Sequence, residues 1–412
     1  MSLIASTRSS LRALTPAERR LVIARFCQRM AGDSSYFIGI LGLATYTLAA
    51  DATQVSMLML VLNTMVVVGN LAGGVIVDRI GPRRCALAAL ALGVVVAVGI
   101  QFVEPSFAMI LVVAVFLGGA VGLQETAFRS FPPYLVEGED KLHRTNGLVE
   151  LATNVSVVAG PAIGGLITMF LPVVRVFLFY IVASVAAMAV ISGVHERYQP
   201  VVQEEEGEPG NGHFMADLVE GVRVTFSSSF LRTLFVMGFL GYFAFGAFDS
   251  LESLYYRDVL CVSADWMGWL TAVMGVGCVV GSLVMLRLPE RALSLRSVVV
   301  ALFVVGTGCM LYVGTPWLAC AVAGQAICGL GFGVLEPLQL TLVQRDTSLT
   351  HMGRVMATMR TGFQGAGILP LLVAPSLADA FGVQAVLLGA STFVACVAVG
   401  FGAWLWARGR WS

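Results

Sequence analysis

Three acidic residues lie in stretches of the chain that are otherwise nearly free of charge: Asp33, Asp249 and Glu252. A carboxyl group among apolar residues can take up and release a proton, because a low-dielectric environment makes its charged form costly. Asp249 and Glu252 are three residues apart, on one face of a helix, where each opposes the ionisation of the other. Asp33 has Arg29 four residues before it, a spacing that favours an ion pair. We expect Asp33 to be the first candidate for proton coupling, and Asp249 with Glu252 to be the second.

Other polar or aromatic side chains within apolar stretches could line a cavity for a small molecule. A charge at the centre of a spanning helix costs about 2.5–3.5 kcal/mol on insertion scales, so such groups should face a cavity or a partner. For any single amide, a hydrogen bond to a neighbouring helix is an equally good explanation. The aromatic residues near 243 suit a hydrophobic cavity and also ordinary packing. The candidates are Asn63, Asn154, Gln325, Arg360, Gln364 and Phe243.

Other kinds of chemistry have little support in the sequence. The four histidines lie in polar segments and the eight cysteines are scattered without metal-ligand spacing, so we expect no metal and no cofactor. The sequence has no HExxH, GxSxG or phosphate-binding glycine-rich motif, and no basic tract for nucleic acid. Glu125 has Arg129 four residues later, which predicts a surface ion pair. We do not expect an enzyme.

These side chains belong to a chain with the composition of a membrane protein. Hydrophobic residues make up 58% of the 412 residues and charged residues 12%, roughly half of the usual share in soluble domains. A membrane-spanning helix needs about 20 mostly apolar residues. By that measure the chain has twelve candidate spans, at 29–49, 54–77, 84–103, 106–127, 147–168, 171–193, 231–254, 264–286, 296–314, 316–341, 353–376 and 383–407.

Charge and polarity orient these spans. If the N-terminus is cytoplasmic, only Arg175 and Arg257 of the 25 Lys and Arg residues lie in or beside outer loops, so the positive-inside rule places both termini in the cytoplasm. Spans three, six, nine and twelve are almost purely apolar, which predicts that they face lipid while the others line a central path. Thr15, Pro16 and Glu18 have the pattern of a helix start, with a capping Thr and a capping-box Glu.

The twelve spans divide into two halves of six. Residues 195–229 lie between them; their first part is acidic and contains Pro and Gly, and residues 214–226 have the apolar spacing of an amphipathic helix at the inner membrane surface. The halves match at an offset of 207–208 residues, with Gly122 on Gly329 and Pro82 on Pro289 among the matches, which favours a duplicated six-helix unit. We therefore expect an all-α membrane protein with a cytoplasmic N-terminal segment (1–28), a six-helix bundle (29–194), a cytoplasmic linker (195–229), a second, pseudo-symmetric bundle (230–407) and a cytoplasmic tail (408–412).

Two motifs carry a resemblance to a known family. The loop between spans two and three resembles the loop 2–3 signature of the major facilitator superfamily, with Pro82 where a basic residue is usual; its residues are Gly74, Asp78, Arg79, Gly81, Arg83 and Arg84. The fifth span resembles the span-five motif of that family's drug:proton antiporters, with Ser156 in place of one glycine; its residues are Gly147, Ser156, Gly160, Pro161, Gly164 and Gly165. Stretches such as FPPYLVEGEDKLHRTNGLVELATN are similar to the macrolide-efflux and enterobactin-exporter branch.

Physical chemistry gives both motifs a role. Asp78 could accept hydrogen bonds at a helix N-terminus, and the resemblance implies span eleven, which starts near Arg354, as its partner. Such a contact, made in one conformation and broken in another, would be a conformational latch; a plain positively charged turn is the alternative. Gly160 and Gly164 form a GxxxG face for close helix packing, and Pro161 predicts a kink.

The resemblance implies the major facilitator fold and secondary active transport. We expect an exporter of amphipathic small molecules (drug, antibiotic or siderophore-like) that works by alternating access and proton antiport, as a monomer in the plasma (inner) membrane of a bacterium. Its partners would be the lipid bilayer, the small-molecule substrate and protons. Relatives carry an arginine in span four, whereas residues 113–122 have no charge; if that arginine assists proton coupling in the relatives, this chain couples differently or not by protons. An importer or facilitator of a metabolite is the alternative, and a membrane scaffold or receptor is a further one.

Overall fold

The computed structural model of the chain describes residues 14–136, 138–194, 211–348 and 351–408. In these ranges all regular secondary structure is helical and no strand occurs, in agreement with the expected all-α class. The chain forms two compact units. Unit 1 comprises Met1–Ala50, Met57–Gln203 and Ser263–Trp269, and unit 2 comprises Asp51–Ser56, Glu204–Val262 and Leu270–Ser412.

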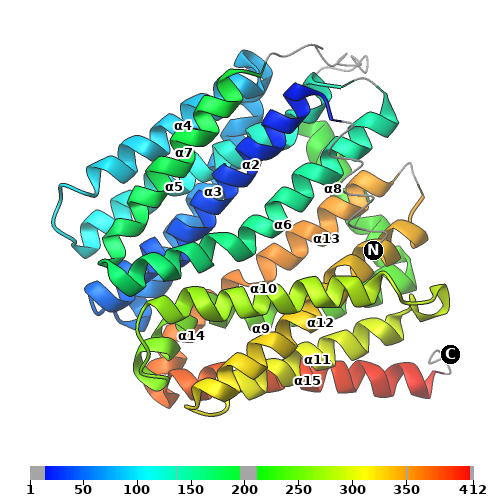
Figure 1. The fold of residues 1–412 in the computed structure, drawn as a ribbon. Coiled ribbons are helices and arrows are strands. Elements are labelled where there is room, and N and C mark those ends of the chain that lie inside the picture. Colours follow the sequence, from blue (N-terminus) through cyan, green and yellow to red (C-terminus); the bar gives the residue numbers. More distant parts are fainter. Residues whose placement is uncertain (1–13, 137, 195–210, 349–350, 409–412) are drawn as a thin grey trace. The chain divides into compact units, whose positions relative to one another are not determined.

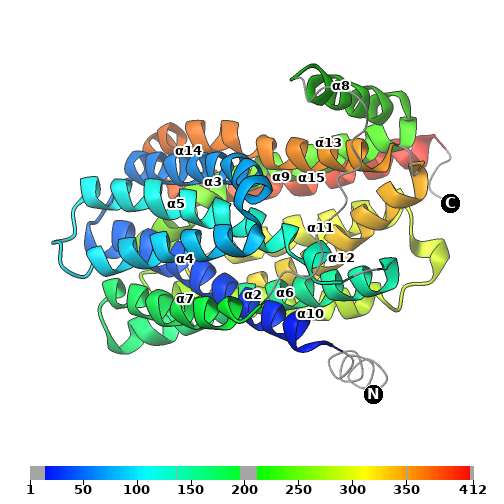
Figure 2. The same cartoon turned by 90° about the horizontal axis from the view of Figure 1, so that it is seen from above.

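Unit 1 is built from long helices that run side by side (Figures 1 and 2). Within it, α2 packs against α6 and α7, and α4 packs against α5 and α7. Its elements are α2 (Pro16–Ser34), the π-helical segments η1 (Ser35–Ile40) and η2 (Leu43–Thr47), α3 (Ala52–Ile80, whose first residues belong to unit 2), α4 (Pro82–Gly99), α5 (Phe107–Ser130), η3 (Pro132–Tyr134), α6 (Glu139–Phe170), η4 (Val173–Arg175) and α7 (Val176–Ser192).

Helix α2 begins at the capping box that the sequence predicts. The Thr15 hydroxyl accepts a hydrogen bond from the Glu18 amide at 3.3 Å, and the Glu18 carboxylate accepts one from the Thr15 amide at 2.7 Å. The helix then continues through residue 28, so the expected start of the first span at residue 29 falls inside it. The apolar pattern did not reveal this first half, because Arg25 is buried by pairing with side chains of α5 and α6, while Arg19 and Arg20 are exposed.

Unit 2 has the same kind of architecture. Helix α9 packs against α14 and α15, and α11 packs against α12 and α15. Its elements are α8 (Asn211–Ser227), α9 (Ser229–Leu254), the π-helical η5 (Tyr255–Val259), α10 (Asp265–Met285, whose first residues belong to unit 1), η6 (Glu290–Ala292), α11 (Leu295–Val313), α12 (Leu318–Asp346), α13 (Met352–Ala366), α14 (Ile368–Phe381) and α15 (Val383–Ala407).

The helix expected after the linker is present as α8. It packs against α13: a β-carbon added at Gly221 would lie 2.6 Å from the Arg354 carbonyl oxygen, and Glu220 forms an ion pair with the Arg354 guanidinium. Of the four apolar residues that predicted this helix, Phe214 and Leu218 have side chains outside the described part, while Val222 and Phe226 are exposed. Its expected place at the membrane surface remains a prediction.

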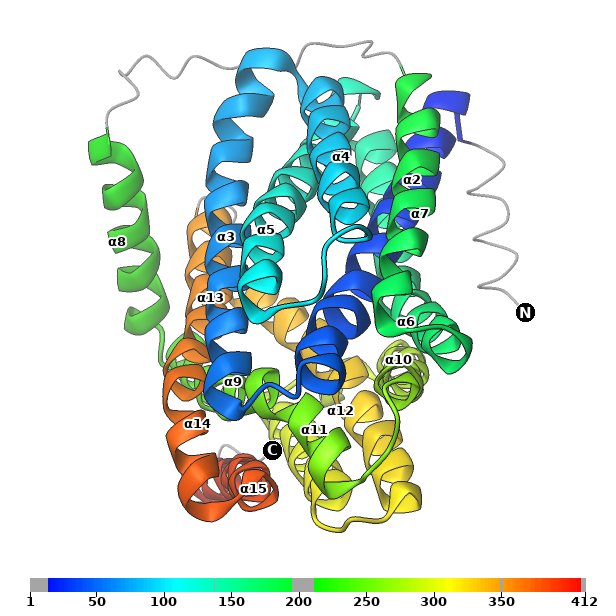
Figure 3. The ribbon, with the colours of Figure 1, turned by 90° about the vertical axis from the view of Figure 1, so that its left-hand side faces the viewer.

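Eleven helices in the described ranges are long and apolar enough to cross a membrane, against the twelve expected. The first expected span (29–49) is not among them; its residues lie in the end of α2, in η1 and in η2. The eleventh expected span consists of two helices, α13 and α14, interrupted at Gly367 and visible end to end in Figure 3. The count of twelve is therefore not confirmed.

Corresponding glycines make equivalent contacts in the two units. A β-carbon added at Gly122 of α5 would lie 2.2 Å from the Val66 carbonyl oxygen of α3. One added at Gly329 of α12 would lie 2.0 Å from the Met274 carbonyl oxygen of α10. A distance below 3 Å leaves no room for a side chain, so in each unit a glycine brings two helix backbones into contact. These two glycines are one of the pairs matched by the sequence offset, and their contacts support the duplication.

Candidate transport and proton-coupling sites

Asp33 lies in the last turn of α2, just before the helix widens into the π-helical η1. Its side chain is 8% exposed, and its Oδ1 lies 3.0 Å from Arg29 Nη2, so the ion pair predicted from the spacing is confirmed. The other oxygen, Oδ2, is buried and has no hydrogen-bond partner among the described residues. A buried carboxylate with one satisfied and one unsatisfied oxygen is costly to keep charged.

Glu125 of α5 is surrounded by three arginines. Arg25 donates to its Oε1 at 3.0 Å and lies 2.9 Å from its Oε2, Arg129 lies 2.8 Å from Oε1, and Arg29 lies 3.6 Å from Oε2. The predicted pair with Arg129 forms, but it is not a surface pair, since the Glu125 side chain is only 14% exposed. Arg25, whose side chain is 2% exposed, was missed because its partners lie on other helices. We call Arg25, Arg29, Asp33, Glu125 and Arg129 the charge cluster.

Uncharged polar groups extend the charge cluster across unit 1. Gln28 of α2 donates to Gln124 of α5 at 3.1 Å, and Gln124 donates to the Ala89 carbonyl of α4 at 3.1 Å and to the Tyr180 hydroxyl of α7 at 3.3 Å. On the other side, Arg25 Nε donates to the Thr153 hydroxyl of α6 at 3.0 Å. Five helices of one unit are thus joined by a buried polar network, which fixes their register.

The span-five motif packs α6 directly against the Asp33 turn of α2. A β-carbon added at Gly160 would lie 2.8 Å from the Met30 carbonyl oxygen and 3.2 Å from Asp33 Cβ, and one added at Gly164 would lie 2.7 Å from the Ser34 hydroxyl. The structure therefore brings together two features that the sequence treated separately: the first acidic candidate and the glycine motif.

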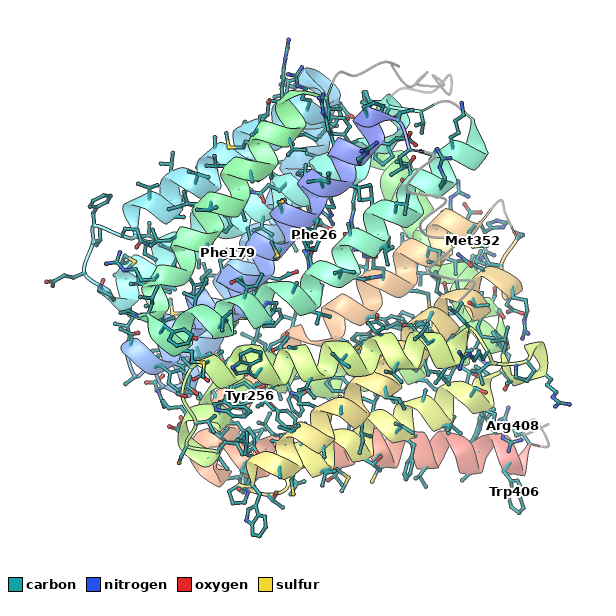
Figure 4. All side chains as sticks on the ribbon, viewed as in Figure 1. Phe26, Phe179, Tyr256, Met352, Trp406 and Arg408 are labelled. Carbon is teal, nitrogen blue, oxygen red and sulfur yellow. The ribbon has the colours of Figure 1, made fainter. Side chains whose placement is uncertain are left out.

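The remaining motif residues divide into contacts and open positions. The Ser156 hydroxyl donates to the carbonyl of Phe26, a residue labelled in Figure 4, at 3.1 Å. Pro161 lies inside α6, and a β-carbon added at Gly165 would lie 2.7 Å from the Asp265 carbonyl oxygen, within the same unit. A β-carbon at Gly147 would meet nothing within 4 Å.

Glu252, near the C-terminal end of α9, lies in a cage of hydrogen-bond donors. Its Oε1 accepts from the Tyr312 hydroxyl at 2.8 Å, from the Tyr256 hydroxyl at 3.0 Å and from the Gln325 amide at 3.2 Å. Figure 4 labels Tyr256, which follows α9 in the π-helical η5. Asp249 is one turn away but exposed, with no hydrogen bond to a described residue. The two acids predicted as a pair are therefore in different environments.

The other cavity candidates do not gather at one place. Gln325 contacts a candidate acid, as described above. Asn63 is half-buried, Asn154 and Arg360 are exposed, and the side chain of Gln364 lies outside the described part. Phe243 lines an apolar pocket of about 650 Å³ between α9, α14 and α15, with the Phe393 ring 6.4 Å away.

The loop 2–3 residues have two kinds of environment within unit 1. Gly81 makes the turn between α3 and α4 at a φ of 82°, which favours glycine, and Arg83 donates to the Ser192 carbonyl at the end of α7. Asp78, Arg79 and Arg84 are exposed. A β-carbon added at Gly74 would meet nothing within 4 Å. Asp78 makes no hydrogen bond to a residue that the structure describes, so its role as a latch remains a proposal.

Two cysteines that the sequence leaves unrelated lie in contact. The sulfurs of Cys309 on α11 and Cys328 on α12 are 3.2 Å apart and both residues are buried. Among the described residues no three His, Cys, Asp or Glu side chains are placed to hold a metal ion.

Comparison with known proteins shows the family. The model of the Major Facilitator Superfamily matches residues 21–371 and 234–411. The chain belongs to this superfamily. The multidrug efflux pump Tap of Mycobacterium tuberculosis is 25% identical over 341 residues, 79% of each chain, and Tap of Mycolicibacterium fortuitum is 25% identical over 342 residues, 79% of this chain and 80% of its own. The family and these relatives point to a multi-pass membrane transporter rather than an enzyme.

Solved structures agree on the fold. The nucleoside transporter NupG matches with a TM-score of 0.68 at 12% identity, over 94% of this chain and 99% of its own. A POT family transporter matches with a TM-score of 0.71 at 13% identity, over 95% of this chain and 98% of its own. The human organic anion transporter MFSD10 matches with a TM-score of 0.61 at 18% identity, over 93% of this chain and 99% of its own. The major facilitator fold expected from the motifs is confirmed.

Proposed function

We propose that this member of the superfamily exports amphipathic small molecules by alternating access, driven by an inward flow of protons. The relatives called multidrug efflux pumps and the span-five motif, which resembles that of drug:proton antiporters, support export. A plasma-membrane location with both termini in the cytoplasm is part of the proposal and rests on the distribution of arginine.

The observation that carries the proton-coupling part is the environment of Asp33. An antiporter needs a carboxyl that is charged in one state and neutral in another. Asp33 has one oxygen paired with Arg29 and one buried oxygen without a hydrogen bond to the described residues. It also lies against Gly160, so a movement of α6 would change its surroundings.

The first experiment finds a transported compound. The gene is expressed in a host that lacks its own pumps, and susceptibility is measured to a panel of antibiotics and dyes. A compound to which the host gains resistance is then added to the medium around inverted vesicles, where export appears as uptake that an imposed proton gradient accelerates. Uptake that no proton gradient accelerates would contradict antiport, and a panel without any protected compound would contradict drug export.

The second experiment places the coupling site. Asp33→Asn should abolish proton release on addition of that compound, while binding of the compound is retained. The double variant Asp249→Asn with Glu252→Gln is the matched comparison, since its acids lie in the other unit. If only the double variant loses proton release, the coupling site is on α9. If all of these variants still release protons, neither Asp33 nor the Asp249 and Glu252 pair is the coupling site.

A further inference from the structure

The ion pair of Asp33 and Arg29 leaves one polar atom of each residue unsatisfied. Asp33 Oδ2 and Arg29 Nε are buried, and neither has a hydrogen-bond partner among the described residues. Buried charged groups normally satisfy all of their polar atoms, because an unmade bond there costs about 1–3 kcal/mol. An ion pair that leaves two such atoms unsatisfied can be improved by moving one side chain.

Arg29 is the side chain with room to move. Its Nη2 lies 3.0 Å from Asp33 Oδ1, its Nη1 lies 3.6 Å from Glu125 Oε2, and its side chain is 26% exposed. Arg25 is held by hydrogen bonds to Thr153, Gln28 and Glu125. Arg129 approaches Glu125 from the exposed side.

The charge of the cluster determines where Arg29 is more stable. The charged groups that face Asp33 are Arg25 and Arg29 on its own helix and Glu125 on α5, and Arg129 contacts Glu125. When both acids are ionised, three cations meet two anions. Once Asp33 takes up a proton, Arg29 loses its nearest anion, and Glu125 is the one carboxylate of the cluster that still attracts it. In surroundings of low dielectric this attraction is stronger than in water.

We propose that Arg29 exchanges between Asp33 and Glu125 according to whether Asp33 carries a proton. Glu125 then acts as a positioning residue: by attracting Arg29 it makes the protonated form of Asp33 easier to reach. The proposal rests on Asp33 as the coupling carboxyl. In this arrangement span four, which is α5, contributes the acid Glu125, and α2 contributes Arg25 and Arg29.

The test measures protonation of Asp33 directly and needs no substrate. Purified protein is titrated with acid and followed by infrared difference spectroscopy, and the carboxyl band that disappears in Asp33→Asn is assigned to Asp33. In Glu125→Gln the midpoint of this band should move to lower pH by about one unit, a tenfold fall in proton affinity. Glu125→Asp keeps the negative charge but places it farther from Arg29, because the side chain is shorter. It should move the midpoint in the same direction, but by less. It also keeps the test open if Glu125→Gln does not fold, since a buried charge without its partner is strongly destabilising.

Two controls separate this role from a general effect of charge. Arg129→Gln removes the exposed partner of Glu125 and should leave the midpoint nearly unchanged. In an Arg29→Gln background, the shift caused by Glu125→Gln should become much smaller, because only the direct repulsion between the two acids remains. A full shift in that background, or an unchanged midpoint in both Glu125 variants, would overturn the proposal. Neither result bears on proton release in vesicles, so this proposal and the transport proposal can fail separately.

Discussion

At the scale of single residues, Glu18 is the acid outside the spans whose environment is best defined. Its side chain is fully buried, and it accepts hydrogen bonds from the Thr145 hydroxyl at 2.7 Å and from Arg144 at 3.2 Å, besides the capping bond from Thr15. Burial raises the pKa of Glu18, but the hydrogen bonds from Thr15, Thr145 and Arg144 together outweigh it, so the pKa lies below its usual range.

A lowered pKa means that the folded protein favours the charged form of Glu18. This stabilisation is present above the ordinary glutamate pKa and is lost as the pH falls through the lower, folded value. Glu18→Gln should therefore reduce the stability of unit 1 at neutral pH by about 1–3 kcal/mol, through the loss of charge-assisted bonds. Thermal unfolding in detergent should show this difference at neutral pH and a smaller one in acid. Glu150→Gln, at an exposed position of α6, is the control, and an equal loss in both variants would contradict this role.

At the scale of elements, the packing of α6 on α2 depends on the absence of side chains at two positions. We expect Gly160→Leu and Gly164→Leu to force the helices apart at Asp33 and to reduce export at least tenfold, with the protein still inserted, because misplacement by about 1 Å is enough for such a loss. Export is measured in vesicles and normalised to the amount of protein.

The control for this prediction comes from the same motif. Gly147→Leu changes a glycine of α6 whose β-carbon would meet nothing within 4 Å, and it should retain export. If all three variants export normally, close packing at Asp33 is not needed. If Gly147→Leu loses as much as the others, the glycines matter for a reason other than this contact.

At the scale of the whole molecule, alternating access requires contacts that exist in one state and not in the other. Asp78 is exposed at the end of α3, and we propose that it forms such a latch. Asp78→Asn should leave insertion unchanged but lower export about tenfold, because one charge-assisted contact at a helix N-terminus contributes about 1–2 kcal/mol. Asp379→Asn, at an exposed position near the end of α14, is the matched control. Normal export in Asp78→Asn would mean that the charged loop serves only to orient the helices in the membrane.

Much of the fold could be predicted from local features, which involve residues close together in the sequence. Long apolar stretches with no alternative to a helix in lipid predicted nearly all of the spans, and the capping box predicted the start of α2 to the residue. The two motifs identified the family, because glycine spacing and a charged turn are local features. The ion pair between Arg29 and Asp33 followed from helix geometry alone, since residues four apart share a face.

The tertiary structure decided which distant residues meet. Arg25 and Glu125 are 100 residues apart, and nothing in either sequence context marks one as the partner of the other. The cage around Glu252 combines side chains of α9, η5, α11 and α12, and the contact between Gly160 and Asp33 joins α2 to α6. The sequence of a helix shows only which of its residues share a face. The neighbour of that face is set by how all helices of a unit pack, and buried polar groups take whichever partner the packing brings within reach.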